Sequence, residues 1–327
     1  MKIFFFLLLL IFPGLIAYAQ KKYDFVVALD GSGNFTTIQA AVDACKAFPS
    51  FSVSIFIKNG IYKEKVVVPA CNTHLRLIGE SADKTILSWD DFFDKIDRGR
   101  NSTFYTYTLK VEADDFRAEN ITIQNFAGPV GQAVALHVEG SRCAFIHCRI
   151  LGNQDTLYLA GENSRDYLAD CYIEGTTDFI FGEATAFFEN CTLYSKSNSY
   201  ITAASTNEGK PYGFVFTKCE LVAAPQVNKV YLGRPWRDYA KVVFLECKLG
   251  NHIAPEGWVN WPKTTRDKTA YYAEYNNTGA GAGILKRVGW SHQLSKKQAK
   301  AYRKEKVLVP DFQSAGPKVC IWATAKE

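Results

Sequence analysis

The feature that most constrains the fold of this chain is a short pattern that recurs five times between residues 145 and 249. Each copy contains an apolar residue, two variable residues, a cysteine, one variable residue and an aliphatic residue. The cysteines are Cys148, Cys171, Cys191, Cys219 and Cys247, with spacings of 23, 20, 28 and 28 residues. A period of this length is typical of stacked supersecondary units that each contact only their neighbours. The chain is therefore predicted to fold as a repeat structure.

Two adjacent copies extend further, as C-x-I-x-G-x-x-D over Cys148–Asp155 and Cys171–Asp178. Asp155 and Asp178 thus occupy the same phase of neighbouring units. If the units stack as coils, the two backbones lie about 4.8 Å apart at this point. Two carboxylates that close resist ionising together, so a protein rarely pairs them without a use.

Short runs rich in Val, Ile, Thr and Phe cover much of the chain before the first copy, with Gly and Asn at the breaks. We expect strands at residues 25–28, 53–57, 65–68, 75–78, 108–111 and 121–123. Because no long helical pattern separates them and the period is 20 to 28 residues, the sequence predicts an all-β parallel β-helix rather than a sandwich.

Two helices are expected, one near each end of the chain. Residues 37–47 carry apolar residues at helical spacing, and a helix there would cover the strand edge at the open end of the coils. Ser295 and Gln298 form a capping-box pattern that predicts the start of a C-terminal helix. With 47% hydrophobic residues among 327, the chain can form one long core, so a single elongated domain is expected.

The first nineteen residues are similar to a secretory signal peptide. Lys2 precedes an apolar run over residues 3–16, and residues 17–19 (Ala-Tyr-Ala) provide a small-x-small cleavage site. The run is short for a membrane-spanning helix, so no membrane association is expected after cleavage. We predict a secreted protein, extracellular or in a cell wall, or periplasmic in a bacterium, with residues 1–19 removed and residues 20–327 forming the functional domain.

Nine cysteines are present, and five belong to the repeat. Equivalent positions on adjacent coils lie within disulfide range, so bridges such as Cys148–Cys171 or Cys191–Cys219 are one alternative. Side chains stacked in one direction seldom adopt disulfide torsions, so we favour a buried ladder of free thiols.

The two aspartates need a fixed positive charge beside one of them if they are to take different roles. Arg234, within Tyr231-Leu-Gly-Arg-Pro-Trp236, is the candidate because its planar guanidinium suits a carboxylate. The pKa of one carboxyl is expected to rise and that of its partner to stay low. The anionic, arginine-paired Asp178 would act as nucleophile and the protonated Asp155 as general acid. The alternative is a structural ladder of Asp and Asn along the stack, with Arg234 in an ordinary ion pair.

Two glutamines favour the catalytic alternative. Gln154 precedes Asp155, and Gln132 lies 22 residues before Gln154, about one coil away. Uncharged amide donors at such positions can stabilise a developing oxyanion. Together with Arg234, these residues predict an acyl-transfer site in which Asp178 attacks an ester carbonyl. Asp155 would protonate the leaving alkoxide and then activate the water that hydrolyses the acyl-enzyme.

Aromatic side chains follow the predicted site residues closely in sequence. Tyr158 and Phe181 each lie three residues after one of the aspartates, and Trp236 lies two after the arginine. Aromatic faces along a groove suit stacking on sugar rings, whereas core packing is the alternative for any one of them. Trp258 and Trp261 are weaker candidates of the same kind.

Taken in order, these motifs resemble those of the pectin methylesterases, a carbohydrate esterase family. The resemblance covers nearly all of the chain from Tyr23 to the C-terminal helix, although Asn153 stands where many plant members have an aromatic residue. It implies a single-stranded, right-handed, pectin lyase-like parallel β-helix with a short N-terminal capping helix and a C-terminal helix. The matching segments are Gly60-x-Tyr62-x-Glu64, Gly131–Leu136, Gly152–Tyr158, Gly175–Gly182 and Leu232–Trp236.

The resemblance implies hydrolysis of the methyl esters of homogalacturonan, with release of methanol and an acidic pectin as product. Asp178 would be the nucleophile and Asp155 the general acid and base. No metal or organic cofactor is expected. The supporting roles are an oxyanion site for Gln132 and Gln154, orientation of Asp178 by Arg234, and substrate binding by Tyr158, Phe181, Arg234 and Trp236.

The expected partner is methylated pectin, and a proteinaceous pectinesterase inhibitor is a further candidate. The net charge of +5 fits ordinary solubility and also mild attraction to a polyanion. Nucleic acid is not an expected partner, and a monomer is expected. Two rival functions are a glycosidase, because two carboxylates about 5 Å apart also suit a retaining mechanism, and a pectin-binding protein without activity.

Overall fold

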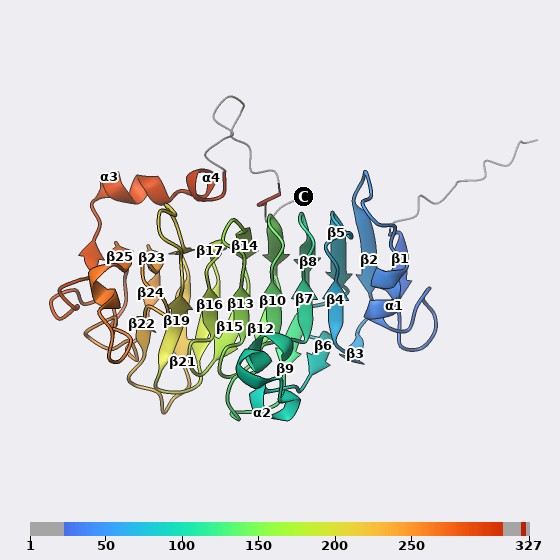
Figure 1. Ribbon diagram of the computed structural model, residues 1–327, viewed down its shortest axis with the longest axis horizontal. Coiled ribbons are helices and arrows are strands. Elements are labelled where there is room, and N and C mark those ends of the chain that lie inside the picture. The colour runs from blue at the N-terminus through green and yellow to red at the C-terminus, as the bar shows by residue number, and fades with distance from the viewer. Residues whose placement is uncertain (1–22, 310–321, 325–327) are drawn as a thin grey trace, which may run out of the picture.

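The computed structural model describes residues 23–309 and 322–324, and within them the chain forms three sheets that run along one elongated body (Figure 1). The sheets contain eleven, eight and seven strands, and neighbouring strands pair in parallel. Strands that are neighbours in a sheet come from successive coils of the chain, as in the order β11-β14-β17-β20. The predicted all-β parallel β-helix is therefore confirmed.

The strands of each sheet follow one another along the stack. The eleven-stranded sheet contains β1 (Phe25–Val27), β2 (Val53–Ile57), β5 (Leu75–Gly79), β8 (Arg117–Glu119), β11 (Cys143–Ile146), β14 (Arg165–Ala169), β17 (Thr185–Glu189), β20 (Phe214–Thr217), β23 (Lys241–Leu245), β25 (Tyr271–Tyr275) and β26 (His292–Gln293). The eight-stranded sheet contains β3 (Gly60–Lys63), β6 (Thr85–Trp89), β9 (Thr122–Asn125), β12 (Arg149–Leu151), β15 (Tyr172–Gly175), β18 (Thr192–Ser195), β21 (Glu220–Ala223) and β24 (Lys248–Leu249). The seven-stranded sheet contains β4 (Val66–Val68), β7 (Leu109–Val111), β10 (Leu136–Val138), β13 (Leu157–Leu159), β16 (Ile180–Gly182), β19 (Tyr200–Ala204) and β22 (Tyr231–Gly233).

The cysteine repeat marks one corner of each coil, where the chain leaves the eleven-stranded sheet for the eight-stranded sheet. The residue before each cysteine has a left-handed backbone, with φ between 52° and 54°, which turns the chain sharply. The cysteine then points into the interior, where a small apolar side chain fits the corner. The residues in the left-handed conformation are His147, Asp170, Asn190, Lys218 and Glu246.

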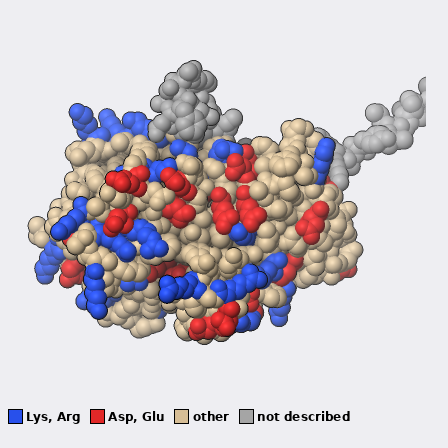
Figure 2. Space-filling model, in the orientation of Figure 1, with Lys and Arg blue, Asp and Glu red and all other residues tan. Residues whose placement is uncertain are grey.

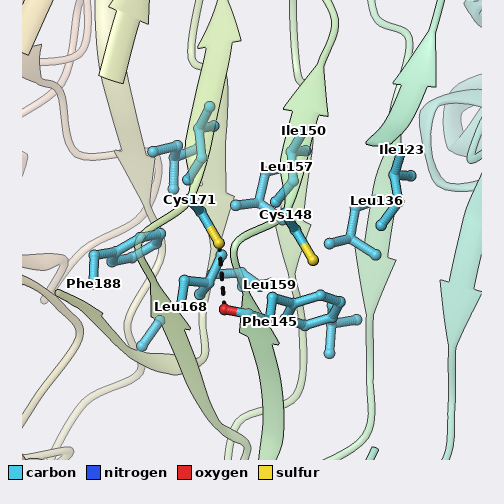
Figure 3. Close-up of a cluster of buried hydrophobic side chains, with 14 of the residues drawn as sticks. Ile123, Leu136, Phe145, Cys148, Ile150, Leu157, Leu159, Leu168, Cys171 and Phe188 are labelled. Atoms are coloured by element: carbon cyan, nitrogen blue, oxygen red, sulfur yellow. Dashed lines mark hydrogen bonds between the residues drawn. The ribbon is translucent and has the colours of Figure 1, made fainter. Parts of the chain in front are cut away.

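The core fills the inside of the coils and contains ladders of like side chains. Phe188, Phe216 and Phe244 stack on successive coils, with ring centroids 4.3 and 4.4 Å apart. Cys171 lies beside this ladder and donates a hydrogen bond from Sγ to the carbonyl oxygen of Phe145 at 3.3 Å (Figure 3). All eight cysteines within the described residues are free, which confirms the thiol ladder for that part of the chain.

The two predicted helical segments are present, one at the N-terminal end of the stack and one on its side. Helix α1 (Ile38–Asp43) begins at the N-cap residue Thr37 and buries Ile38, Ala41 and Val42 against the first coil. It is shorter than the expected range 37–47, because the chain leaves the helix at Ala44.

The predicted capping box of Ser295 and Gln298 is present at the C-terminal end. It starts only one turn, however, α3 (Lys296–Ala299), followed by η3 (Lys300–Tyr302) and α4 (Lys304–Val307). This segment packs on the outer face of the eleven-stranded sheet, where Val307 is buried. Figure 2 shows basic side chains gathered near α3 and α4, while both signs of charge are interspersed over the rest of this face.

The remaining helices are α2 (Phe93–Ile96), η1 (Gly99–Tyr105) and η2 (Arg266–Lys268). The predicted signal peptide, residues 1–19, lies outside the described residues. Among the residues that are described, no helix is long and apolar enough to cross a membrane. The six strands predicted before the repeat all occur, with bounds within two residues of those expected.

Candidate active site

A cleft of about 540 Å³ lies over the outer face of the seven-stranded sheet and contains most of the predicted site residues. It is open to solvent. The predicted residues that line it are Gln132, Gln154, Asp155, Asp178, Phe181, Arg234 and Trp236.

Asp155 and Asp178 lie on successive coils at equivalent positions, as the repeat predicts. Each precedes a strand of the seven-stranded sheet by two residues, and these strands pair with Leu157 opposite Ile180. Both aspartates have left-handed backbones, with φ of 62° and 49°. Such a conformation costs free energy for a non-glycine residue and is typical of functional sites, where the surrounding structure maintains it.

The glycine of the C-x-I-x-G-x-x-D motif is required by close packing below this turn. A Cβ atom on Gly175 would lie 2.2 Å from the Cβ of Phe179 and 2.6 Å from the carbonyl oxygen of Asn153. No side chain fits at these distances without moving the backbone. The motif therefore combines a tight turn with an aspartate that points out of the coil.

Arg234 fixes the carboxylate of Asp178. Its Nε donates to Oδ1 at 3.0 Å and its Nη2 donates to Oδ2 at 2.6 Å. The Asp178 backbone is also held, because its N–H donates to the carbonyl oxygen of Tyr200 at 2.8 Å. A bidentate arginine–carboxylate pair of this kind is both strong and directional.

The pKa values of the two carboxyls are shifted by different causes, and not entirely as expected. Burial and the charge of Asp178 raise the pKa of Asp155 well above its ordinary value, against the opposing charge of Arg234. Burial also raises the pKa of Asp178, so the expectation that this pKa stays low is wrong. The hydrogen bonds and charge of Arg234 oppose the rise at Asp178 directly, which leaves Asp155 as the more basic carboxylate.

The two glutamines lie together at one end of the aspartate pair. Gln132 and Gln154 pair as an isolated parallel bridge between neighbouring coils. Both side chains are partly exposed and line the cleft. Both side chains therefore belong to the same cleft as the two aspartates.

The aromatic candidates divide into cleft and core residues. Phe181 and Trp236 line the cleft with ring centroids 5.8 Å apart in an edge-to-face arrangement. Tyr158 is 9% exposed and does not line the cleft. Its ring stacks against that of Phe181, with centroids 4.6 Å apart, and supports it. Trp258 is fully buried in the interior, whereas Trp261 lines the cleft.

The cleft also contains residues that the sequence analysis missed. The segment of α2 and η1 forms one wall, and it is attached to the site by a hydrogen bond from the Phe93 N–H to the Gln132 carbonyl oxygen at 2.9 Å. The signal available in the sequence was the break in strand texture over residues 90–106. Arg237, adjacent to the predicted Trp236, was also missed. The lining residues from the missed wall are Phe93, Arg100, Asn101, Thr103 and Phe104.

Within residues 23–309 and 322–324, no group of three or more His, Cys, Asp or Glu side chains is arranged to hold a metal ion. The charged side chains that line the cleft are the two aspartates and three arginines, Arg100, Arg234 and Arg237. The three parallel sheets and the cleft outside one of them place the chain in the class of parallel β-helix proteins with a surface cleft.

Comparison with known proteins identifies the family. The Pectinesterase family model matches residues 24–311. Pectinesterase 31 of Arabidopsis thaliana is 38% identical over 281 residues, covering 84% of this chain and 88% of the relative. The solved structure of pectin methylesterase from carrot has a TM-score of 0.83 and 32% identity, covering 89% of this chain and 94% of that one. The chain therefore belongs to the pectinesterase family of carboxylic ester hydrolases.

The name of another relative includes both a pectinesterase and a pectinesterase inhibitor. Probable pectinesterase/pectinesterase inhibitor 23 of Arabidopsis thaliana is 38% identical over 305 residues, which cover 89% of this chain but only 53% of the relative. The chain thus spans about half the length of that protein.

Proposed function

We propose that this protein hydrolyses the methyl esters of homogalacturonan, releasing methanol and leaving de-esterified pectin. Membership of the pectinesterase family and similarity to a pectin methylesterase structure support the reaction class. The observation that carries the mechanism is the bidentate contact of Arg234 with Asp178 directly beside the more basic Asp155. This contact places a fixed positive charge beside one of two neighbouring carboxyls in one open cleft and supports different roles for them.

In the first step, an Asp178 oxygen attacks the ester carbonyl carbon. The carbonyl oxygen becomes an oxyanion, which the amides of Gln132 and Gln154 stabilise by hydrogen bonding. As the intermediate collapses, the bond to the methoxy oxygen breaks and Asp155 donates its proton, so methanol leaves. An anhydride between Asp178 and the galacturonate remains.

In the second step, the ionised Asp155 takes a proton from a water molecule that attacks the acyl carbon. The anhydride bond breaks, the galacturonate leaves as an acid, and Asp178 is released as a carboxylate beside Arg234. Asp155 is protonated again and ready for the next ester. The raised pKa of Asp155 supports this double role, because a general acid and base works best when its pKa approaches the working pH.

The composition of the cleft supports a polysaccharide substrate that carries some free carboxylates. Phe181 and Trp236 offer apolar faces for sugar rings. Arg100 and Arg237 line the same cleft, and neither forms an ion pair with any described residue. Unpaired guanidinium groups favour an acidic polymer.

The location and partners of the enzyme are also proposals. The N-terminal pattern of residues 1–19 supports secretion, with residues 20–327 as the catalytic domain. A proteinaceous pectinesterase inhibitor is a proposed partner, supported by relatives whose names include such an inhibitor. We propose that the enzyme acts as a monomer.

The test is to incubate the protein with highly methylated pectin and to measure methanol and new reducing ends in parallel. We expect methanol to rise while reducing ends stay at the level of the blank. Reducing ends without methanol would show a glycosidase instead, and binding with neither product would show a pectin-binding protein.

A further inference from the structure

Arg234 belongs to a column of stacked cationic and aromatic side chains beside the cleft. The column runs from the loop before β22, across β22 and β19, to the segment that contains Trp261 and η2. Each member contacts the next at 4.0 to 6.0 Å, measured from the cationic group to the ring centroid or between two ring centroids. In order, the members are Lys229, Tyr231, Tyr200, Arg234, Trp261 and Arg266.

The guanidinium of Arg234 lies between two rings in this column. Its central carbon is 4.0 Å from the ring centroid of Tyr200 and 4.0 Å from that of Trp261. The N–H groups of a planar guanidinium all donate within its plane, so rings packed against its faces restrict the orientation of that plane. Two of these donors are directed at the two oxygens of Asp178.

Tyr200 contacts both members of the ion pair by different parts of the residue. Its ring covers Arg234, and its carbonyl oxygen accepts the backbone N–H of Asp178 at 2.8 Å. The ring is supported from its other side by Tyr231, which stacks at 5.7 Å with an interplanar angle of 25°. Unlike Trp261, Tyr200 does not line the cleft.

We propose that Tyr200 is a positioning residue for the esterase reaction, which acts by holding the Arg234 guanidinium in the plane that binds Asp178. This inference rests on the proposed function, since it assigns Tyr200 a role through Arg234. The hydroxyl group makes no hydrogen bond with the described residues, so the aromatic face is the part that acts. Without the ring, water reaches one face of the guanidinium and the side chain can tilt away from Asp178.

The variant Tyr200→Leu tests this role. We expect kcat on methylated pectin to fall on the order of tenfold, as loss of a partly desolvated cation–π contact predicts, while KM changes less than twofold. The acidic limb of the kcat/KM profile should move to higher pH, because a less well-held Arg234 no longer keeps Asp178 ionised. Tyr200→Phe keeps the ring and should restore most of the activity and the original profile.

Tyr194→Leu is the matched control, because Tyr194 is a half-buried tyrosine on β18 in the eight-stranded sheet, outside the column and the cleft. It should leave both kcat and the pH profile unchanged. A Tyr200→Leu enzyme with parental kcat and pH profile would overturn the proposal. So would a Tyr200→Phe enzyme as impaired as the Leu variant.

A double-mutant cycle covers the case in which Tyr200→Leu lowers folding yield. Arg234→Lys keeps the charge but removes the planar fork, so the loss caused by Tyr200→Leu should largely disappear in that background. If the fold-losses in kcat of the two single variants multiply in full in the double variant, Tyr200 does not act through Arg234. If Arg234→Lys alone had no effect on methanol release, the proposed function of Arg234 would fail, which is a separate outcome.

Discussion

The Arg234 guanidinium donates to both oxygens of Asp178, at 3.0 Å from Nε to Oδ1 and 2.6 Å from Nη2 to Oδ2. This contact separates two carboxyls that the repeat otherwise makes equivalent. Asp178 has a guanidinium partner, whereas the carboxyl of Asp155 forms no ion pair with any described residue. The two carboxyls thus differ in environment because of one side chain, Arg234, that comes from another coil.

Replacing Asp178 by Asn is predicted to remove turnover without removing substrate binding. The amide keeps the shape of the side chain but cannot attack an ester. We expect kcat to fall by at least about 10³, while co-sedimentation with insoluble pectin is retained. Asp155→Asn should give a similar loss, because it removes the proton donor. Parental methanol release by the Asp178 variant would contradict the nucleophile assignment.

Replacing Arg234 by Ala is predicted to change the pH dependence as well as the rate. Burial raises the pKa of Asp178 and Arg234 lowers it, so loss of the arginine lets the pKa rise further. The active anion then forms only at higher pH, and the acidic limb of kcat/KM moves upward. Rate measurements across the acidic range would check this, and an unshifted limb would refute the role of the pair.

Replacing Gln154 by Leu is predicted to lower kcat by roughly 10² to 10³, as for loss of one oxyanion donor. The effect on KM should be smaller, because the amide is needed mainly when charge develops on the carbonyl oxygen. Gln226→Leu, in an exposed loop, provides a control that should match the parent. Equal kcat for the two variants would remove Gln154 from the proposed mechanism.

The thiol ladder predicts that reductant does not affect stability. All eight cysteines within the described residues are free, so no disulfide among them contributes to folding. With Cys320 replaced by Ser, since it lies outside those residues, dithiothreitol should leave the melting temperature unchanged. A native disulfide would contribute about 2 to 4 kcal/mol, so a fall of several degrees on reduction would reveal one.

The repeat allowed the coils and the stacked aspartates to be predicted because it records the period of the backbone. Residues that occupy the same place in successive copies of the repeat lie opposite each other on neighbouring coils, as the pairing of Leu157 with Ile180 shows. The wall formed by residues 93–105 could not be placed, because an insertion outside the period has no fixed register. That wall contributes Phe104, whose ring centroid lies 5.0 Å from that of Tyr158. Because the wall could not be placed, the sequence could not show that Phe104 covers this tyrosine.

Asp166 provides a further prediction, because it is a carboxyl inside the core. It lies on β14 on the same strand face as Leu168, is 0% exposed, and has no hydrogen-bond partner for either side-chain oxygen among the described residues. Burial raises its pKa well above the ordinary value; the nearby Cys143 N–H opposes this rise in part, and the charge of Asp114 adds a smaller increase.

The sign of the effect on stability follows from proton binding. Between the unfolded pKa of about 3.9 and the raised folded value, the native state binds a proton that the unfolded state has lost. The free energy of unfolding therefore decreases as pH rises through this window, by up to about 1.4 kcal/mol per pH unit. Asp166→Asn, which cannot ionise, should gain stability relative to the parent as pH rises from 4 to 7.

Urea unfolding at several pH values measures this difference directly. Asp83→Asn is the control, since the Asp83 side chain is 81% exposed and should leave the pH dependence unchanged. The prediction fails if the free energies of unfolding of Asp166→Asn and the parent differ by the same amount at pH 4 and pH 7. A growing advantage for the variant would show that the β-helix retains a neutral acid in its core and loses stability when that acid ionises.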